Sequence, residues 1–386
     1  MQIKLKKVTD GYDKQEFLNF PVLLNKDNPN YIRPLDQDVE KVFDPQQNKF
    51  FKSGICERFL VIDRKHYDVV GRFAVFINNR YQQEQHTGGI GFVDFIDDFE
   101  ISNFIFEVAK NWLSSKGIEA MDGPINFGER EQWWGLLVEG FHEPLYAMNY
   151  NLPYYQKHFE RFGFQVYFNQ LCFGRKIDAP LSEKFELSHK RLSKLSDINI
   201  KEIKPHNLKK FAKDFLEIYN KAWASHGEGK QMNEFQAQKL FKSMKHVIDP
   251  RIAFIAYEKE KPIGMWINLP DLNQWFKHYN GKFGFLNKIK FLFAKRFHKN
   301  TRAVGLIFGI VPEWQGKGLD GYMIYEGKLR IPKKTEYIDY ELQWIGDFNP
   351  KMLRIAEELE TTVTRKLITY RYLFDRTIPF KRHRML

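Results

Sequence analysis

The residues best suited to bind a charged ligand are three glycines in the segment Gln315-Gly316-Lys317-Gly318-Leu319-Asp320-Gly321. An apolar, β-prone run at residues 304–311 precedes this segment, and a helix-like stretch at residues 322–329 follows it. Glycine lets a backbone turn tightly and approach a ligand closely. The free N–H groups and the dipole at a helix start favour negative charge. The order of strand, glycine loop and helix therefore predicts an anion site, with an ordinary turn as the alternative.

The same segment resembles motif A of the GNAT superfamily of N-acetyltransferases, whose usual form is Gln/Arg-x-x-Gly-x-Gly/Ala. Gln315, Gly318 and the preceding Val311-Pro312-Glu313 match it, whereas Asp320 stands where Gly or Ala is usual. The resemblance implies acetyl-CoA or another acyl-CoA as cofactor, with its pyrophosphate on the loop amides and its pantetheine arm along the preceding strand. The residues that it implies for cofactor binding are Ile310, Val311, Gln315, Gly316, Lys317, Gly318, Leu319, Gly321 and Asn349.

Transfer of an acyl group from a thioester to an amine requires a base for the ammonium proton. It also requires a group that stabilises the oxyanion or protonates the departing thiolate. Glu341, on a predicted strand at residues 336–344, is our candidate base. For a glutamate in a strand, a structural ion pair is the alternative.

The resemblance implies a tyrosine as the acid, at a position that Ala356 occupies in this chain. The acid would then be Tyr372 or Tyr370, on the last predicted strand at residues 363–374, unless none is used. For both tyrosines, packing in the core is the alternative. The absence of the usual acid argues against ordinary acetyl transfer.

A turn-rich polar stretch, Gly123-Pro124-Ile125-Asn126-Phe127-Gly128-Glu129, follows a predicted strand at residues 118–125. Asn126 and Glu129 are therefore candidates for substrate binding in a cleft between the halves. A local turn and a solvated carboxylate are the alternatives. Trp344 is a candidate for lining the same pocket, although most of the abundant aromatic residues must belong to the core.

The chain of 386 residues is long enough for one large or two ordinary domains. Two units repeat one order of strands and helices, at residues 1–180 and 199–386, and a connecting segment at 181–198 joins them. Each unit contains a segment that resembles the Asn-initiated helix of GNAT proteins, one at Asn151 and one at Asn349. We therefore expect an α/β fold of two GNAT-like domains, with mixed, mostly antiparallel sheets flanked by helices. The whole resembles uncharacterised bacterial double-GNAT proteins and, more distantly, Fem-type aminoacyltransferases.

The first unit lacks a glycine loop at the matching place. Its strand at residues 88–95 leads instead into Ile96-Asp97-Asp98-Phe99-Glu100, which is acidic and would repel a pyrophosphate. We interpret the first unit as a degenerate copy that shapes the substrate side.

The amino-acid composition limits the kinds of binding partner and the cellular compartment that we expect. The formal charge of +12 favours acidic partners, which can be coenzyme A, anionic lipid or nucleic acid. Of these, we expect no nucleic acid. The two cysteines, Cys56 and Cys172, support neither a disulfide framework nor a zinc site, and no metal-ligand spacing occurs. No signal peptide or membrane-spanning stretch is evident. We expect a cytoplasmic protein.

An insertion at residues 271–300 carries seven lysines and arginines and, from residue 272 onward, no Asp or Glu. Drawn as a helix from Phe285, one face gathers apolar residues and the other carries Lys288, Lys290 and Lys295, while Phe291 and Arg296 break the pattern. Such a helix either packs its apolar face on the core or lies in an anionic membrane interface. The apolar face comprises Phe285, Leu286, Ile289, Leu292, Phe293 and Phe297.

These observations predict an acyl-CoA-dependent N-acyltransferase, acting on a small-molecule or lipid-like amine. One alternative is Fem-like transfer from an aminoacyl-tRNA, against which the glycine loop speaks. The other is a non-catalytic module that binds acyl-CoA or lipid at a membrane surface, which Ala356 and Asp320 favour.

Overall fold

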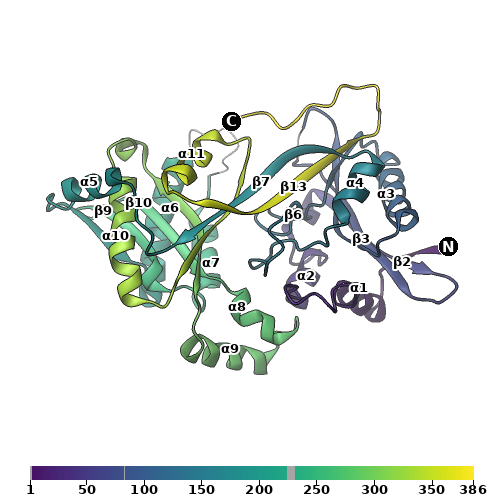
Figure 1. Ribbon diagram of the computed structural model, residues 1–386, viewed down its shortest axis with the longest axis horizontal. Helices are drawn as coiled ribbons and strands as arrows, with labels where there is room; N and C mark the ends of the chain where they lie inside the picture. The colour runs from purple at the N-terminus through teal and green to yellow at the C-terminus, as the bar shows by residue number, and fades with distance from the viewer. Residues whose placement is uncertain (1, 82, 224–230) are drawn as a thin grey trace.

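A computed structural model describes residues 2–81, 83–223 and 231–386 of the chain. One continuous sheet, formed by 13 strands of the described residues, runs through the elongated molecule and carries helices along its length (Figure 1). The strand order is β1-β2-β3-β4-β5-β13-β7-β12-β11-β10-β9-β8, and β6 pairs with β13 beside this path. Parallel pairing occurs, among the described strands, between β4 and β5 and between β11 and β12. The predicted mixed, mostly antiparallel sheet is confirmed.

The first half supplies strands and helices in the predicted order, with one strand, β6, that the sequence analysis missed. Its strands are β1 (Ile3–Lys7), β2 (Gly54–Asp63), β3 (Val69–Asn78), β4 (Thr87–Phe95), β5 (Ala120–Gly123), β6 (Leu136–Glu139) and β7 (Gln165–Lys176). Its helices are α1 (Gly11–Leu24), α2 (Asp36–Val42), α3 (Phe99–Ser114) and α4 (Tyr155–Phe162), with a 3-10 turn, η1 (Lys49–Lys52).

The connecting segment contains a helix, α5 (Glu183–Leu192), and the second half then repeats the order of the first. Its strands are β8 (Ile198–Glu202), β9 (Ala253–Glu258), β10 (Lys261–Pro270), β11 (Arg302–Ile310), β12 (Asp339–Gly346) and β13 (Thr362–Leu373). Its helices are α6 (Leu208–Trp223), α7 (Glu234–Met244), α8 (Asn273–Phe276), α9 (Phe285–Phe297), α10 (Leu319–Lys334) and α11 (Pro350–Glu358). Short 3-10 turns are η2 (Pro205–Asn207), η3 (Pro250–Ile252), η4 (Lys277–Tyr279) and η5 (Pro312–Trp314).

The last strand of each half pairs with the other half. β7, from the first half, pairs with β12, while β13, from the second half, pairs with β5 and β6. The two exchanged strands also pair with each other, from Thr362 opposite Gly174 to Arg371 opposite Gln165. They cross the centre of the molecule together (Figure 1). The halves therefore share one sheet, and the division at residues 180 and 199 stays a prediction about folding units.

Each half nevertheless has its own large core. In the first half, Phe106, Phe159 and Phe164 of the α3–α4 region pack together and onto the sheet. In the second half, Phe215 of α6 and Met323 of α10 belong to one buried cluster with strands β9 and β10. The sequence also predicts a helix at residues 208–224; it is confirmed as far as Trp223, and residue 224 lies outside the described residues.

Candidate active site

The centre of the candidate site is the place where β11 and β12 separate. The two strands pair in parallel from Arg302 opposite Asp339 to Gly305 opposite Leu342, and the pairing then ends although both strands continue. The β10–β11 ladder also skips Leu306, because Ile267 lies opposite Ile307 and Asn268 lies opposite Gly305. A bulge of this kind leaves a backbone group outside the ladder. We call the point at Gly305 and Leu342 the vertex.

An apolar cavity of about 90 Å³ lies beside the separating strands. Phe308 of β11 and Leu342 of β12 line it, together with Ile324 of α10 and Ile355 of α11. The part of the chain that leads into α5 closes it with Leu181. The cavity therefore has the apolar walls that the arm of an acyl donor requires.

Three polar groups meet where this cavity reaches the vertex. The Tyr340 hydroxyl donates to Asn268 Oδ1 at 3.1 Å and accepts from Trp266 Nε1 at 3.1 Å. It lies so close to Gly305 that an added Cβ there would collide with it. Burial raises the pKa of Tyr340 above its usual value, so the hydroxyl keeps its proton at neutral pH. The sequence analysis missed Tyr340 and Asn268. A polar residue within an apolar strand is the pattern that would have indicated them.

The glycine loop lies beyond the open end of the two strands. Gly316 and Gly318 have φ values of +70° and +79°, and Gly318 is the N-cap of α10. A Cβ added at Gly316 would meet no atom within 4 Å, so the backbone is open to a ligand there. Gln315 Nε2 donates to the carbonyl of Ile310 at 3.0 Å and ties the loop to the strand end. The loop and the start of α10 together present backbone N–H groups to an anion.

Arg191 of α5 lies against this loop and was missed by the sequence analysis. Its Nη2 donates to the carbonyl of Lys317 at 2.5 Å and lies 2.7 Å from the Cβ position of Gly318. A guanidinium beside the loop adds positive charge for a phosphate. The connecting segment therefore contributes to the site.

The structure gives other roles to some residues that the resemblance placed at the cofactor. Gly321 faces α5, where Ser188 Cβ would lie 2.9 Å from an added Cβ, so its small size serves helix packing. Asn349 Oδ1 accepts the N–H of Met352 at 3.2 Å and caps α11. Val311 and Leu319 are fully buried, so their side chains belong to the core and only their backbone faces the loop.

Glu341 lies on the other side of the vertex from Tyr340, because successive side chains of a strand point to opposite faces. It is 3% exposed and ion-paired with Arg365, at 3.1 Å from Nε to Oε1 and 3.3 Å from Nη2 to Oε2. Thr364 Oγ1 donates to the same Oε1 at 3.0 Å. Glu341 is thus one residue from the vertex, and it makes the structural ion pair that was the alternative to a catalytic role.

Arg302 links Glu341 to a second buried carboxylate, Asp271. Its Nη1 lies 3.7 Å from Glu341 Oε2 and 3.4 Å from Asp271 Oδ2. Burial, partly offset by Arg302, raises the pKa of Asp271 to about 6. Burial, with Arg365 and Arg302, lowers the pKa of the adjacent His142 to about 4, so this imidazole is neutral at pH 7. The sequence analysis missed Asp271, Arg302 and His142.

The structure does not bring Tyr372 near Glu341. Tyr372 lies in the core of the first half against Phe162 and Phe164, opposite Met121 of β5. Eight residues of extended strand separate it from Thr364, roughly 26 Å at 3.3 Å per residue. Tyr370 is fully buried and donates to Glu160 at 2.9 Å. A catalytic role for Tyr372 therefore stays a prediction with no geometric support. Ala356, at the position where the resemblance implies the acid, is fully buried in α11.

The acceptor candidates of the first half separate into two groups. Asn126 is 3% exposed, and its Oδ1 has no hydrogen-bond partner among the described residues. The indole N–H groups of Trp133 and Trp134 are likewise buried without such partners. Trp344 borders the aromatic cluster that contains Trp133, Trp134 and the two chain neighbours of Asn126, Ile125 and Phe127. Glu129, by contrast, is exposed and paired with Lys49 at 2.5 Å.

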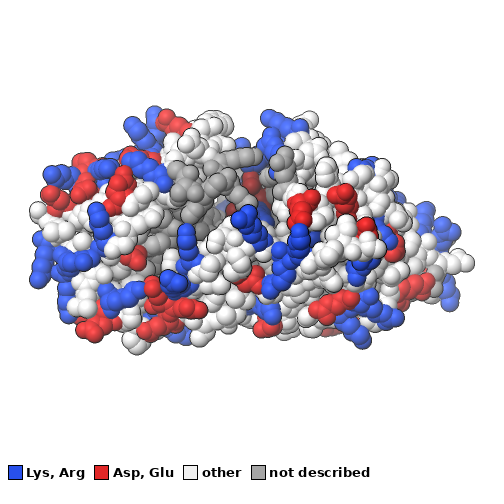
Figure 2. All heavy atoms as spheres, turned by 90° about the horizontal axis from the view of Figure 1, so that it is seen from above, with Lys and Arg blue, Asp and Glu red and all other residues white. Residues whose placement is uncertain are grey.

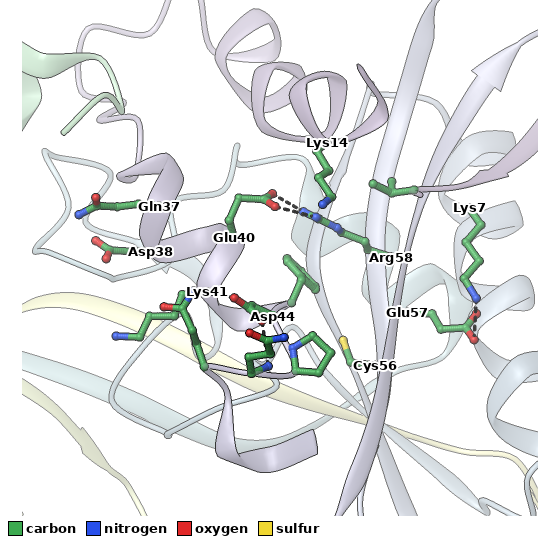
Figure 3. A pocket seen from close by; sticks show the side chains of 15 residues that line it. Lys7, Lys14, Gln37, Asp38, Glu40, Lys41, Asp44, Cys56, Glu57 and Arg58 are labelled. Carbon is green, nitrogen blue, oxygen red and sulfur yellow. Dashed lines mark hydrogen bonds and ion pairs between the residues drawn. The ribbon is translucent and has the colours of Figure 1, made fainter. Parts of the chain in front are cut away.

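A second cavity, of about 840 Å³, lies elsewhere, between α1, α2 and β2 of the first half (Figure 3). Its walls are charged, but Arg58 pairs with Glu40 at 2.5 Å and Lys7 pairs with Glu57 at 3.0 Å. It contains none of the predicted site residues. We therefore do not assign the active site to this groove.

Within the described ranges, no cluster of His, Cys, Asp and Glu could hold a metal ion. None of the described helices combines the length and hydrophobicity that crossing a bilayer requires.

No known family model matches the chain. It is 26% identical over 358 residues to the bacterial ceramide synthase of Caulobacter vibrioides (strain NA1000 / CB15N), covering 90% of this chain and 91% of that protein. It is 25% identical over 360 residues to protein YghO of Escherichia coli (strain K12), covering 90% and 89%.

Among solved structures, the chain is similar to a tandem GNAT protein from the clavulanic acid biosynthesis pathway. The TM-score is 0.54 at 9% identity, over 98% of this chain and 100% of that one. At this identity the likeness concerns the fold. The predicted fold is confirmed: the chain has the tandem GNAT-like α/β fold.

Proposed function

We propose that this protein is an N-acyltransferase that transfers an acyl group from acetyl-CoA or another acyl-CoA to a lipid-like amine. The observation that carries the proposal is the vertex between β11 and β12. It has an apolar cavity and a glycine loop on the donor side and buried carboxylates on the opposite face. Similarity to a ceramide synthase over 90% of the chain supports a lipid-like acceptor.

The second half fits an acyl-CoA. Gly316, Gly318 and the start of α10 would hold the pyrophosphate, with positive charge from Arg191. The apolar cavity would take the arm that leads to the vertex. When bound, acyl-CoA supplies a thioester whose carbonyl carbon the amine attacks and whose sulfur leaves as a thiolate. Asp320, in the first turn of α10, lowers the positive potential there but leaves Gly316 open.

On the donor face, we assign proton donation to Tyr340. The hydroxyl is protonated, lies over Gly305 at the vertex and is oriented by Asn268 and Trp266. Its raised pKa keeps the proton on the hydroxyl, so Tyr340 would act by donating a hydrogen bond to the sulfur as negative charge develops on it, and would pass the proton over only as a base on the other face takes one from the amine. Tyr340 therefore fills the role that Ala356 cannot.

On the acceptor face, two carboxylates can take the amine proton. Glu341 was predicted from the sequence, but both of its oxygens accept hydrogen bonds from Arg365, which a proton transfer would have to weaken. Asp271 has a pKa near 6, closer to the neutral range in which general bases work best. Arg302 contacts both carboxylates, so Glu341 and Asp271 share one positive partner, and a proton taken by either carboxylate is felt by the other.

The polar end of the acceptor would lie in the first half. Buried polar atoms without partners are rare in folded proteins. Asn126 Oδ1 and the indole N–H groups of Trp133 and Trp134 are such atoms among the described residues, and they lie within one segment. An acceptor bearing hydroxyl groups beside its amine would satisfy them. Glu129 is paired with Lys49 and is not needed for this site.

The first half would not hold a second acyl-CoA. The turn after β4 carries Asp97, paired with His158 at 2.9 Å, and Asp98, which caps α3. Two carboxylates at that turn disfavour a pyrophosphate. The unpaired cysteines, Cys56 and Cys172, are consistent with a reducing cytoplasm as the place of action.

The test is an acyl-transfer assay with purified protein, a series of acyl-CoA donors and long-chain amino alcohols as acceptors. We expect free thiol and amide product in equal amounts, measured by a thiol reagent and by mass spectrometry. Tyr340→Phe should lower kcat about 10²-fold with little change in KM for the donor, since general acids contribute 10²–10⁴-fold. Tyr325→Phe, at a half-buried tyrosine of α10 whose ring contacts His189 of α5, is the matched control.

Three results would contradict the proposal. Binding of acyl-CoA in native mass spectrometry without turnover would indicate a non-catalytic module. Amide formation from an aminoacyl-tRNA but from no acyl-CoA would indicate the Fem-like alternative. Thiol release without amide would make the protein a hydrolase.

A further inference from the structure

Helix α9 presents its apolar face to solvent. Six large side chains of this helix are between 39% and 77% exposed, and only one residue, Phe291, is buried. The helix projects with α8 from the lower edge of the molecule in Figure 1, beside α1 and α2. An exposed apolar surface of this kind marks an interaction site. The exposed residues are Phe285, Leu286, Ile289, Leu292, Phe293 and Phe297.

The orientation of α9 is set by contacts on its other side. Phe291 is 4% exposed and packs against the rings of Trp275 and Phe276, each 5.6 Å away. Lys295 Nζ donates to the carbonyls of His246 and Ile248 at 2.9 and 3.2 Å. The residue that broke the amphipathic pattern in the sequence is thus the anchor, and the apolar face is not a core face.

The charged residues of α9 itself are all positive. Lys288 and Lys290 are exposed and lie on the two flanks of the apolar stripe in a helical projection, while Arg296 and Lys299 are exposed at its C-terminal end. Residues 272–300 include no Asp or Glu. By contrast, the face seen in Figure 2, viewed from the side opposite α9, mixes acidic and basic residues. The cationic rim identifies the partner as anionic.

We infer that α9 docks the protein on the surface of a membrane that contains anionic lipids, with the apolar face in the interface and the cations at the headgroups. An interfacial helix has this combination of an apolar stripe and flanking Lys and Arg. With 13 residues, α9 is shorter than the ~20 needed to span a bilayer. A second copy of the chain is a poorer occupant, because two α9 helices would bring like charges together.

Docking through α9 would also place the candidate site close to the lipid. The insertion leaves β10 at Pro270 and returns at Arg302, the first residue of β11, three residues from the vertex at Gly305. Asp271 and Arg302 join the two ends by a hydrogen bond from the Asp271 N–H to the Arg302 carbonyl at 2.9 Å. The inference that α9 docks on a membrane does not depend on acyl transfer. With a lipid-like acceptor, docking would bring the site to the membrane that contains the acceptor.

The experiment is co-sedimentation of the full chain with vesicles, either of phosphatidylcholine alone or with one-third phosphatidylglycerol. We expect sedimentation with the anionic vesicles only. Phe285→Ser, Ile289→Ser and Phe293→Ser together should lower the partition coefficient at least tenfold without changing the thermal midpoint, because all three side chains are exposed. Lys288→Gln with Lys290→Gln should lower it roughly 25-fold, since each such charge near an anionic surface contributes about fivefold.

A matched control replaces three exposed apolar residues on other elements, Leu23, Leu195 and Phe235, with Ser. This variant should bind as the natural chain does. Equal loss in the control, binding to neutral vesicles as strong as to anionic ones, or no binding at all would overturn the inference. Sedimentation velocity could instead show that the natural chain is a dimer and that the α9 triple variant is a monomer. This result would also overturn the inference. Unchanged acylation of a water-soluble amine by the triple variant would show that a docking defect is separate from catalysis.

Discussion

Replacing Glu341 by Gln should destabilise the protein as well as slow it. Arg365 has a side chain with no exposed surface, and Glu341 supplies its carboxylate partner at 3.1 Å. Removing one partner of a buried ion pair costs about 3–5 kcal/mol, because the other charge is left without compensation. Arg302, at 3.7 Å from the Glu341 carboxylate, would add to the uncompensated positive charge.

The cost translates into a measurable shift. At about 2 cal/mol/K of unfolding entropy per residue, 386 residues give a thermal midpoint lower by about 4–6 °C. Scanning calorimetry would measure the shift, and the acyl-transfer assay would be run on the same samples. We expect the rate of Glu341→Gln to fall about 10²–10⁴-fold, the range for loss of a general base.

The double variant Glu341→Gln, Arg365→Met separates the two roles. Replacing a buried ion pair by neutral side chains of similar volume is often close to neutral, so the midpoint should return to within about 2 °C of the natural chain. If the rate stays low in this stable variant, Glu341 is the base. If the rate recovers without either side chain, Glu341 only compensates the buried charge of Arg365, and Asp271 takes the proton. A midpoint of Glu341→Gln unchanged within 1 °C would refute the reasoning about the buried pair.

Two further outcomes follow from the same geometry. Asp271 has a folded-state pKa raised to about 6, so the stability that its neutral form provides is complete below pH 4 and is lost as pH rises through 6. Urea titrations should show that the unfolding free energy of the natural chain falls by about 2–3 kcal/mol more than that of Asp271→Asn between pH 4 and 7.5. If the unfolding free energies of the two proteins change in parallel with pH, the assignment is wrong. Calorimetric titration should find one coenzyme A per chain. Gly318→Glu should lose most of that binding. Gly117→Glu, also at positive φ but far from the loop, is the control and should keep it. Two sites per chain, or full binding by Gly318→Glu, would refute the assignment.

Local sequence pattern was sufficient for most of the elements and for the position of the glycine loop. The sequence predicts a strand at residues 69–78, and β3 has these bounds, because an apolar run and its flanking turn residues act within a few residues of chain. The glycine loop was evident for the same reason: the positive φ of Gly316 and Gly318 is a requirement of the local backbone. Helix α10, however, runs on to Lys334 past Pro332, because Ile331 is buried in the core and its packing outweighs the local cost.

Partners distant in the sequence were decided only by the tertiary structure. The exchange of β7 and β13 between the halves leaves no mark on either strand, because strand pairing is a non-local choice. The same applies to Glu341, whose partner Arg365 comes from the exchanged strand β13, and to Asp271, whose raised pKa depends on burial. The periodicity of α9 identified an apolar face, but only the anchoring of Phe291 among aromatic rings decided that this face is turned toward solvent. A hydrophobic pattern states that a face must be covered, whereas the packing of neighbouring elements determines what covers it.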